Sequence, residues 1–277
     1  MVELHPVSIE RVREFWDARP CNVRHSAEPV GTRACFNEVE ARKYLVKPHI
    51  RRFARFEDWA GKRVLEIGCG MGTDTISFAR HGAVVTAVDL SEESLSIARR
   101  RAEVFGLQDR IRFLAGNAEE LTRFVPLEPY DLVYSFGVIH HTPHPQRVLE
   151  QIHPYLNPGS TLKIMVDHRR SFKVLSIFLK YGRGRFWRLP ELVARHSEAQ
   201  TGCPLTHTYT RRQARDLLER HWLRVSELFV DHVFAYRIPD YADHRYVKVW
   251  YFRWLPRRVF AWLERRFGWH LCLTGQA

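Results

Sequence analysis

The chain has 277 residues, 45% of them hydrophobic, which is enough for one large domain with a cap or for two small domains. It has no apolar run long enough to cross a bilayer, and Met1 to Pro6 lack a charged-then-apolar signal pattern. The five cysteines are scattered, with no C-x-x-C pair, so we expect neither a disulfide framework nor a metal centre. A cytoplasmic location is the default expectation.

The formal net charge of +12 is distributed unevenly along the chain. Residues 1–60 carry 11 basic and 9 acidic side chains, and residues 61–162 carry 10 and 12. Residues 163–277 carry 22 and 10, so the whole excess lies in the C-terminal part. Such a region can bind nucleic acid, anionic lipid or an acidic substrate, or it can be a solvated arginine-rich surface.

Residues 1–60 are expected to form helices and loops. Ser8 can cap a helix that runs from Glu10 to Asp17, and two more helices are expected at 36–44 and 48–59. The polar loop at 19–26 separates the first helix from the second. Because no compact core is evident here, we predict an N-terminal helical cap at 1–60 that packs over the next part of the chain.

Residues 61–167 alternate regularly between strand and helix patterns. Apolar runs predict strands at 64–68, 84–89, 111–115, 131–135 and 161–166, and helices are expected at 73–81, 92–105, 118–124 and 145–155. Runs such as the one at 84–88 suit strands that are buried on both faces of a parallel sheet. The pattern therefore predicts an α/β core with a mostly parallel sheet.

The pattern breaks after Asp167. Residues 168–210 are basic and aromatic, and we expect them to form a lid inserted after the fifth strand. Residues 211–277 are expected to complete the core. A helix begins at Thr210 and runs to about His221, and a sixth strand follows at 223–230. The seventh strand is expected at 232–238 or at 246–252, before an aromatic helix that follows Pro256.

Three alternating glycines follow the first predicted strand, at positions 68, 70 and 72. Glycine lets the backbone approach a ligand closely and adopt positive φ. Glu66 stands two residues before the first glycine, where a carboxylate would repel a pyrophosphate but suits an ammonium group. Asp89 ends the second predicted strand, where an acid can accept hydrogen bonds from both ribose hydroxyls.

The run E-x-G-x-G-x-G resembles motif I of the class I S-adenosylmethionine-dependent methyltransferases, and Asp89 matches the ribose-binding acid of that family. Residues 131–141 resemble the fourth-strand motif of the subgroup that includes ubiquinone- and menaquinone-biosynthesis methyltransferases. The resemblance implies a Rossmann-like sheet of about seven strands that binds S-adenosyl-L-methionine and releases S-adenosyl-L-homocysteine. The implied cofactor residues are Glu66, Gly68, Cys69, Gly70, Thr73, Asp74, Asp89, Leu90, Asn117, Ala118, Ser135, Phe136 and Val138.

His140 and His141 follow the fourth strand, beside the expected position of the transferred methyl group. An unperturbed imidazole titrates near neutral pH, so either histidine can act as the base for a hydroxyl or ammonium acceptor. The alternative is that one of the two packs against the sheet or the cofactor.

A further group of polar residues could contact the acceptor. The candidates in the cap and the lid are Arg19, Cys21, His25, Tyr44, His49, His207 and Tyr209. For each of them, ordinary packing within the cap or lid is the alternative interpretation.

Two stretches combine aromatic and basic residues. Residues 169–180 could form a basic amphipathic helix that rests on a membrane or a lipid-like substrate. The aromatic stretch at 250–267 is interpreted first as a helix packed on its own domain or on a second subunit, with membrane contact as the alternative.

The expected function is methyl transfer to an oxygen, nitrogen or sulfur atom of a small-molecule acceptor, by a monomer or homodimer. The alternatives are a tRNA or rRNA methyltransferase that uses the basic C-terminal part, and a lipid or quinone methyltransferase at the membrane surface. A third alternative is a protein that binds the cofactor without catalysis. The sequence contains neither an Asn/Asp-Pro-Pro-aromatic motif nor a recognisable RNA-binding module.

Overall fold

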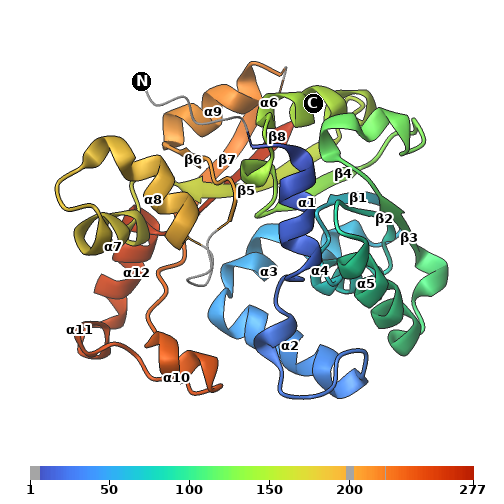
Figure 1. Cartoon of the computed structure of the whole chain (residues 1–277). Helices are drawn as coiled ribbons and strands as arrows, with labels where there is room; N and C mark the ends of the chain where they lie inside the picture. Colours follow the sequence, from blue (N-terminus) through green and yellow to red (C-terminus); the bar gives the residue numbers. More distant parts are fainter. Residues whose placement is uncertain (1–6, 198–202, 222) are drawn as a thin grey trace.

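The computed structural model describes residues 7–197, 203–221 and 223–277, so the segment from Met1 to Pro6 lies outside the described residues. One sheet of eight strands forms the centre of the molecule (Figure 1). Its strands are β1 (Arg63–Ile67), β2 (Val84–Asp89), β3 (Ile111–Ala115), β4 (Leu132–Phe136), β5 (Thr161–His168), β6 (Thr208–Tyr209), β7 (Arg224–Asp231) and β8 (His270–Gln276).

The strand order is β3-β2-β1-β4-β5-β8-β7, with the short β6 paired to the end of β5. Strands β1 to β6 run parallel to one another, and β8 is antiparallel to both β5 and β7. The order reverses at β1 and β4, and this is the place where open α/β sheets bind ligands beyond the carboxyl ends of their strands.

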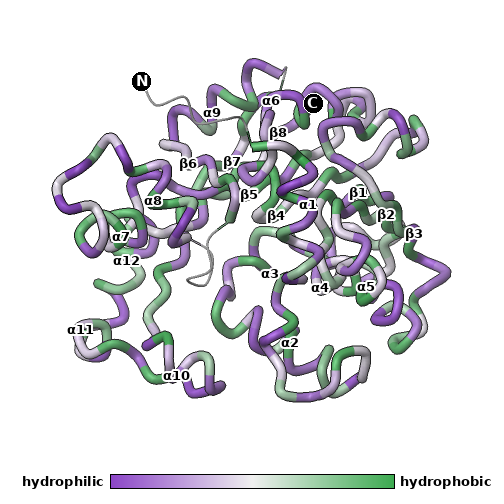
Figure 2. Tube along the Cα trace, viewed as in Figure 1, coloured by the Kyte–Doolittle hydropathy of each residue, from purple (hydrophilic) through white to green (hydrophobic). Residues whose placement is uncertain are grey.

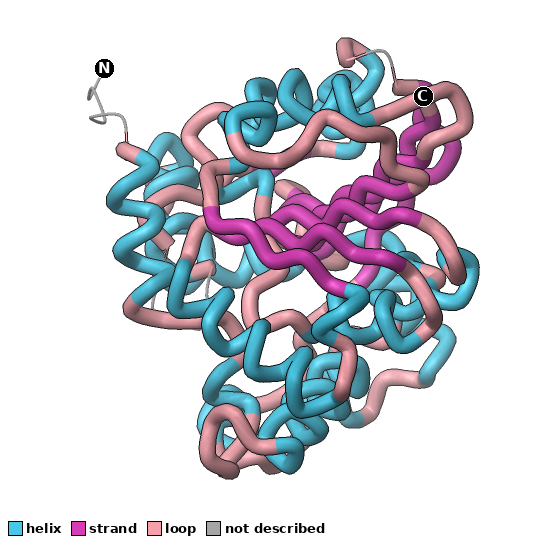
Figure 3. Tube along the Cα trace, turned by 90° about the vertical axis from the view of Figure 1, so that its right-hand side faces the viewer, coloured by secondary structure: helices cyan, strands magenta, loops and turns pink. Residues whose placement is uncertain are grey.

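Helices cover both faces of the sheet (Figure 3). The α-helices of the described residues are α1 (Ile9–Asp17), α2 (Arg33–Val46), α3 (His49–Ala54), α4 (Thr73–Arg80), α5 (Glu92–Phe105), α6 (Pro145–Ile152), α7 (Phe172–Tyr181), α8 (Leu189–His196), α9 (Arg211–Glu219), α10 (Ile238–Ala242), α11 (Trp250–Arg253) and α12 (Arg257–Phe267). Apolar side chains of α6 and α9 form the core on one face, and those of α3, α4 and α5 form the core on the other.

The predicted third helix, at 48–59, is two elements in the structure. Helix α3 ends at Ala54, and a 3₁₀ turn follows at Phe56–Trp59. Arg55 between them has φ +52°, which breaks the helix because a left-handed residue cannot continue a right-handed one.

The expected position of the seventh strand is wrong. The strand lies at His270–Gln276, and the two expected segments, 232–238 and 246–252, contain the start of α10, an isolated bridge between Tyr236 and Lys248, and part of α11. β8 fills the gap between β5 and β7, where its buried side chains complete the core. The aromatic segment at 232–269 is therefore an insertion before the last strand.

Within the described residues, no helix is long and apolar enough to cross a membrane. The five cysteines form no disulfide; Cys21 is exposed and the other four are buried.

Candidate functional site

The glycine loop joins β1 to α4 and turns sharply at its three glycines. Gly68, Gly70 and Gly72 have φ of +78°, +54° and +75°. A Cβ atom on Gly68 would lie 2.1 Å from Cγ2 of Val138, so this position has no room for a side chain. A Cβ atom on Gly70 would meet no atom within 4 Å, so the loop leaves open space at that position. This is the geometry of a backbone cradle that a ligand can approach.

Asp89 lies at the end of β2, beside the glycine loop. Its Oδ2 accepts a hydrogen bond from the Gly70 amide at 2.7 Å, and its Oδ1 accepts one from the Ser91 amide at 2.9 Å. Burial raises the pKa of Asp89, while the backbone hydrogen bonds from Ser91 and Gly70 oppose the rise. The carboxylate is thus fixed beside the glycine loop with acceptor capacity left on both oxygens.

Glu66 is buried in β1, directly behind the loop. Its Oε2 accepts a hydrogen bond from the Thr75 hydroxyl at 2.5 Å. Burial, and then the charge of Asp74, raise the pKa of Glu66 to about 8. A carboxyl group with this pKa is mostly protonated at neutral pH until a cation approaches it.

The side chains of two expected cofactor residues, Thr73 and Asp74, are hydrogen-bonded to other side chains of the protein. The Thr73 hydroxyl accepts a hydrogen bond from the buried Arg101 at 2.7 Å. The Asp74 carboxylate accepts hydrogen bonds from Lys43 at 2.7 Å, Tyr44 at 2.9 Å and Tyr134 at 3.0 Å. Because Lys43 and Tyr44 belong to α2, this network ties the N-terminal helices to the core. Tyr44, an expected substrate residue, is buried in the same network.

The other expected cofactor residues lie around the ends of β1, β2, β3 and β4. Cys69 is buried in the loop, Leu90 follows Asp89, and Asn117 accepts a hydrogen bond from the Glu119 amide at 3.0 Å. Ala118 packs in the core, and the Ser135 hydroxyl donates to the Ile67 carbonyl at 3.1 Å. Phe136, the last residue of β4, and Val138 after it are half-buried.

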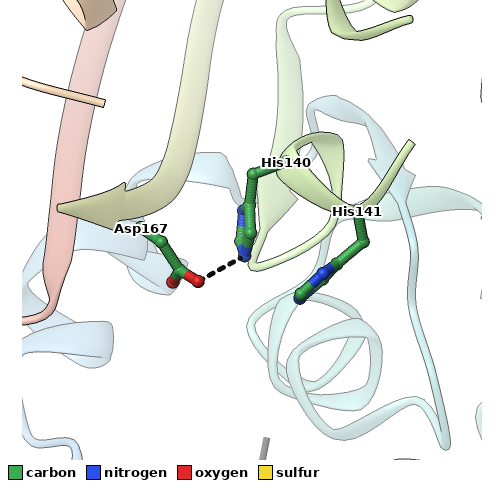
Figure 4. Close-up of side chains that lie close together, drawn as sticks. All are labelled: His140, His141 and Asp167. Carbon is green, nitrogen blue, oxygen red and sulfur yellow. Dashed lines mark ion pairs between the residues drawn. The ribbon is translucent and has the colours of Figure 1, made fainter. Parts of the chain in front are cut away.

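The two candidate bases lie at the end of β4 beside an acid that we did not predict (Figure 4). His140 Nε2 is 3.3 Å from Oδ2 of Asp167, the last but one residue of β5, and both side chains are 2% exposed. His140 Nδ1 is buried without a hydrogen-bond partner. Among the described residues, His140, His141 and Asp167 have ligand atoms within 4.8 Å of one another and could therefore hold a metal ion. The sequence signal that could have revealed Asp167 is its position near the end of an apolar strand, where Asp89 also lies.

His141 is held by the lid. Its Nδ1 is 2.9 Å from the Leu205 carbonyl and 3.3 Å from the Thr206 hydroxyl, and its ring meets Trp16 of α1 edge-on at 5.6 Å. Burial, and then the neighbouring His140, lower the pKa of His141 to about 3. The His207 amide donates to the His140 carbonyl at 2.8 Å, so this expected substrate residue does lie at the pair.

The remaining expected substrate residues have other surroundings. Tyr209 of β6 pairs with His168 of β5, and the Tyr209 carbonyl accepts a hydrogen bond from the Arg169 amide at 2.8 Å. Arg19 lies over the Phe15 ring, and Cys21 is exposed. The His25 ring is half-buried and meets Tyr241 of α10 edge-on at 5.9 Å. Burial, followed by nearby cations, lowers the pKa of His25 to about 3. The contacts named here for Arg19, His25 and Tyr209 do not involve His140 or His141, so the substrate roles of these residues stay predictions.

His49 belongs to a buried histidine cluster that the sequence did not reveal. Its Nε2 is 2.8 Å from Nδ1 of His270, and the His232 ring lies 4.5 Å from the His270 ring. Phe136 packs against His270, with ring centroids 5.4 Å apart, so the cluster borders the end of β4. Burial lowers the pKa of His49 to about 4 and lowers those of His232 and His270 well below the usual value.

This cluster predicts that acid destabilises the fold. The folded-state pKa of His49 is about 4, below the unfolded value, so the unfolded chain binds more protons between about pH 6.5 and 4. We expect the free energy of unfolding to fall by about 1.4 kcal/mol per pH unit for each such histidine as the pH drops through this window. Urea unfolding at pH 7 and pH 5 measures the loss.

The matched variants are His49→Gln and His153→Gln, because His153 is exposed. The first substitution should reduce the difference between the two pH values, and the second should leave it unchanged. An equal difference in both variants would exclude His49 as a source of the acid sensitivity.

Comparisons with known proteins show which part of this chain is similar to them. A family model described as a methyltransferase domain matches residues 64–159. Ubiquinone biosynthesis O-methyltransferase of Coxiella burnetii (strain RSA 493 / Nine Mile phase I) is 34% identical over 102 residues, which are 37% of this chain and 42% of that protein. The protein of the same name from Aeromonas salmonicida (strain A449) is 37% identical over 109 residues, 39% of this chain and 44% of that one. The chain therefore spans less than half the length of these relatives.

Solved structures resemble the whole chain in fold. Magnesium protoporphyrin IX methyltransferase (ChlM) from Synechocystis PCC 6803, with bound SAH, has a TM-score of 0.59 and 15% identity, covering 96% of this chain and 97% of that one. The [4+2]-cyclase SpnF also has a TM-score of 0.59, with 18% identity over 96% and 94%. Residues 64–159 thus match a methyltransferase domain, and the mostly parallel sheet of the whole chain has the fold of these solved structures.

Proposed function

We propose that the protein transfers a methyl group from S-adenosyl-L-methionine to an oxygen, nitrogen or sulfur atom of a small-molecule acceptor. The observation that carries the proposal is the cradle of Gly70, Asp89 and Glu66: open space at a glycine, flanked by one acid suited to a ribose and another suited to a cation. The methyltransferase match at 64–159 supports the same reading.

The residues present fit the cofactor. Asp89 would accept hydrogen bonds from the ribose hydroxyls, and Gly70 would face the sugar without a side chain in the way. Glu66 would face the ammonium group of the methionine end, directly or through water. Asn117 and Ala118, after β3, would border the adenine, and Ser135, Phe136 and Val138 would border the methionine end. The cofactor, when bound, supplies an activated methyl group on a sulfonium.

The protein's own contribution is positioning and proton handling. An in-line displacement needs the acceptor atom held near the methyl group, which accounts for much of the catalysis in such a reaction. The His140–Asp167 pair is the group that can receive the proton of a hydroxyl or ammonium acceptor, since His140 Nδ1 is unpartnered while Asp167 stays at Nε2. His141 is held through Nδ1 by the lid.

We infer that the described part of the segment 1–60 acts as a cap and that the described part of residues 168–210 acts as a lid. Lys43 and Tyr44 of α2 reach the Asp74 network behind the glycine loop, and Leu205 and Thr206 reach His141. Both segments therefore touch the proposed site, which supports an enclosed, small acceptor. Enclosure also excludes water from a reactive methyl donor.

A change in the protonation of Glu66 is expected when the cofactor binds. Its pKa of about 8 means that it is mostly protonated at pH 7, and an ammonium group beside it would favour the ionised form. Binding should therefore release a fraction of a proton, which calorimetry in buffers of different ionisation enthalpy measures. In Glu66→Gln the release should disappear, whereas Glu93→Gln, at an exposed acid of α5, should retain it. Unchanged proton release in Glu66→Gln would place the titrating group elsewhere.

The base assignment has its own test. We expect His140→Ala and His141→Ala to lower turnover by about 10²-fold or more if the acceptor needs deprotonation, while the affinity for S-adenosylhomocysteine stays nearly constant. Asp167→Asn should reproduce most of the His140→Ala defect and shift the pH profile of turnover. His153→Ala, at an exposed histidine, is the control. Full turnover in both histidine variants would mean that neither is the base.

The first experiment on the proposed function is a calorimetric titration with S-adenosylmethionine, S-adenosylhomocysteine and NAD, followed by methyl transfer across an acceptor panel. Micromolar binding of the two sulfur nucleotides, without NAD, supports the cofactor assignment. Preference for NAD would overturn it. Binding without turnover on any acceptor would favour a non-catalytic role, and methylation of tRNA or rRNA would favour the nucleic-acid alternative. A quinone or other lipid as the only accepted substrate would favour the membrane-surface alternative.

A further inference from the structure

Large apolar side chains are exposed mainly in two segments, residues 169–196 and 250–267, which we call the aromatic–basic surface. Trp187, Trp250, Trp254 and Trp262 are 66%, 76%, 79% and 53% exposed. The other exposed apolar residues of these segments are Leu175, Leu179, Tyr181, Phe186, Tyr251, Val259 and Phe267. These are 11 of the 18 large exposed apolar residues found in the described part of the chain. Apolar surface gathered in this way marks a contact site rather than scattered exposure.

The two segments adjoin in the folded chain. Helices α7, α8, α11 and α12 lie on one side of the molecule (left in Figure 1). The Phe172 ring of α7 meets the Phe252 ring of α11 at 5.3 Å, and Phe252 meets Phe260 of α12 at 5.4 Å. The packed side chains thus hold α7, α11 and α12 together, and Figure 2 shows apolar and hydrophilic residues interleaved along this part of the trace.

The same surface carries almost the entire net charge of the protein. Residues 169–196 and 250–267 together contain 13 basic and 2 acidic side chains, a net charge of +11 out of +12. In the described residues, the salt bridge between Arg188 and Glu191 is the one that involves either segment. The other acid, Glu264, has its pKa raised to about 7, mainly by burial. The arginines of the two segments other than Arg188 are therefore available to an anionic partner.

We propose that the aromatic–basic surface binds the protein peripherally to an anionic membrane. Indole rings favour the headgroup region, and aliphatic side chains such as Leu179 can enter the hydrocarbon boundary. Each Lys or Arg near an anionic bilayer adds to the attraction. A second copy of the chain would present the same positive charge and be repelled. A nucleic acid would complement the charge of the arginines but would not bury the apolar side chains of Leu175, Leu179 and Val259, which are 52%, 73% and 42% exposed.

The location of the surface connects it to the proposed site. Helix α7 begins five residues after Asp167, and α7 and α8 belong to the proposed lid. Membrane binding would therefore bring the lid, and the acceptor side behind it, to the bilayer. That connection depends on the proposed function, whereas binding to the membrane does not.

The experiment is sedimentation of the full chain with vesicles, without cofactor or acceptor. One set of vesicles is phosphatidylcholine alone, and the other is an equimolar mixture with phosphatidylglycerol. We expect binding to the anionic vesicles only, with a blue shift of tryptophan fluorescence and weaker binding as salt is raised. Failure to bind either kind of vesicle overturns the proposal and leaves the proposed methyl transfer untouched, because that is measured separately by cofactor titration.

Two pairs of variants separate the aromatic contribution from the charge. Trp250→Ala with Trp254→Ala, and Arg257→Gln with Arg258→Gln, should each lower the vesicle partition coefficient by about tenfold or more. The matched controls are Leu45→Ala with Leu127→Ala and Arg110→Gln with Arg112→Gln, which are exposed residues outside the surface. Circular dichroism confirms that each variant is folded. Equal losses of vesicle binding in the test and control pairs would overturn the proposal. A dimer of the wild type in sedimentation equilibrium that is lost when Trp250 and Trp254 are replaced would also overturn it, as would tighter binding to tRNA than to the vesicles.

Discussion

Replacing Gly68 with alanine should lower the free energy of unfolding by about 2–4 kcal/mol, as the sum of two physical effects. The first is backbone strain, because φ at Gly68 is +78°. The second is overlap, because the new Cβ would lie 2.1 Å from Val138 Cγ2. Urea unfolding at neutral pH measures the sum. Adding Val138→Ala should restore part of the free energy lost through the overlap, and the loss from backbone strain should remain.

Two other glycines provide matched controls. Gly106, after α5, has φ +68° and no atom within 4 Å of an added Cβ, so Gly106→Ala should cost about 1 kcal/mol of strain alone. Gly70→Ala should have a similar small effect on stability, since its surroundings are also open, but it should abolish cofactor binding because the Cβ would enter the cradle. If Gly68→Ala and Gly106→Ala lowered the free energy of unfolding equally, the close approach of Val138 to Gly68 would not restrict the loop.

Replacing Asp89 with alanine should weaken binding of S-adenosylhomocysteine by about 1.5–3 kcal/mol, the range for losing hydrogen bonds to a charged group. The carboxylate would lose its contacts with the ribose and also its hold on the Gly70 amide at 2.7 Å. Calorimetric titration measures the loss. Asp89→Asn, which keeps one acceptor oxygen, should lose less.

The ribose contact can be separated from the loop contact. Wild-type protein should bind adenosine more tightly than 2′,3′-dideoxyadenosine, and Asp89→Ala should make the two affinities nearly equal. Asp109→Ala, at an exposed acid before β3, is the control and should change neither affinity. Should Asp89→Ala bind S-adenosylhomocysteine as tightly as the wild type, Asp89 would not be the ribose acid.

The elements that follow local patterns were predicted closely. Strands β2 and β3 and helix α5 have the bounds expected for 84–89, 111–115 and 92–105, because buried strands and amphipathic helices leave a continuous signal in sequence. β8 was missed because its seven residues include glycine and glutamine, and its place in the sheet depends on pairing with β5, more than a hundred residues earlier. Long-range pairing of this kind leaves no mark in the strand itself.

The site divides in the same way. Gly68, Gly70 and Asp89 lie together because consecutive βα units bring them to one edge of the sheet, so a motif reveals them. The partners of Thr73 and Asp74 come from α5, α2 and β4, and the sequence gives no sign of these side-chain contacts. His232 and His270 meet His49 only because β7 and β8 return beside α3. These contacts could be identified only from the three-dimensional structure.

The position of β8 has a consequence for synthesis on the ribosome. β7 emerges first, yet within the described sheet its one paired neighbour is β8, which follows after an insertion of 38 residues. Until residues 270–276 have left the exit tunnel, β5 and β7 both present an open edge to the surroundings. Unpaired strand edges promote aggregation, so the nascent chain has a vulnerable interval between the emergence of β7 and the emergence of β8. Pausing or truncation within the insertion would prolong that interval and favour chaperone capture over folding.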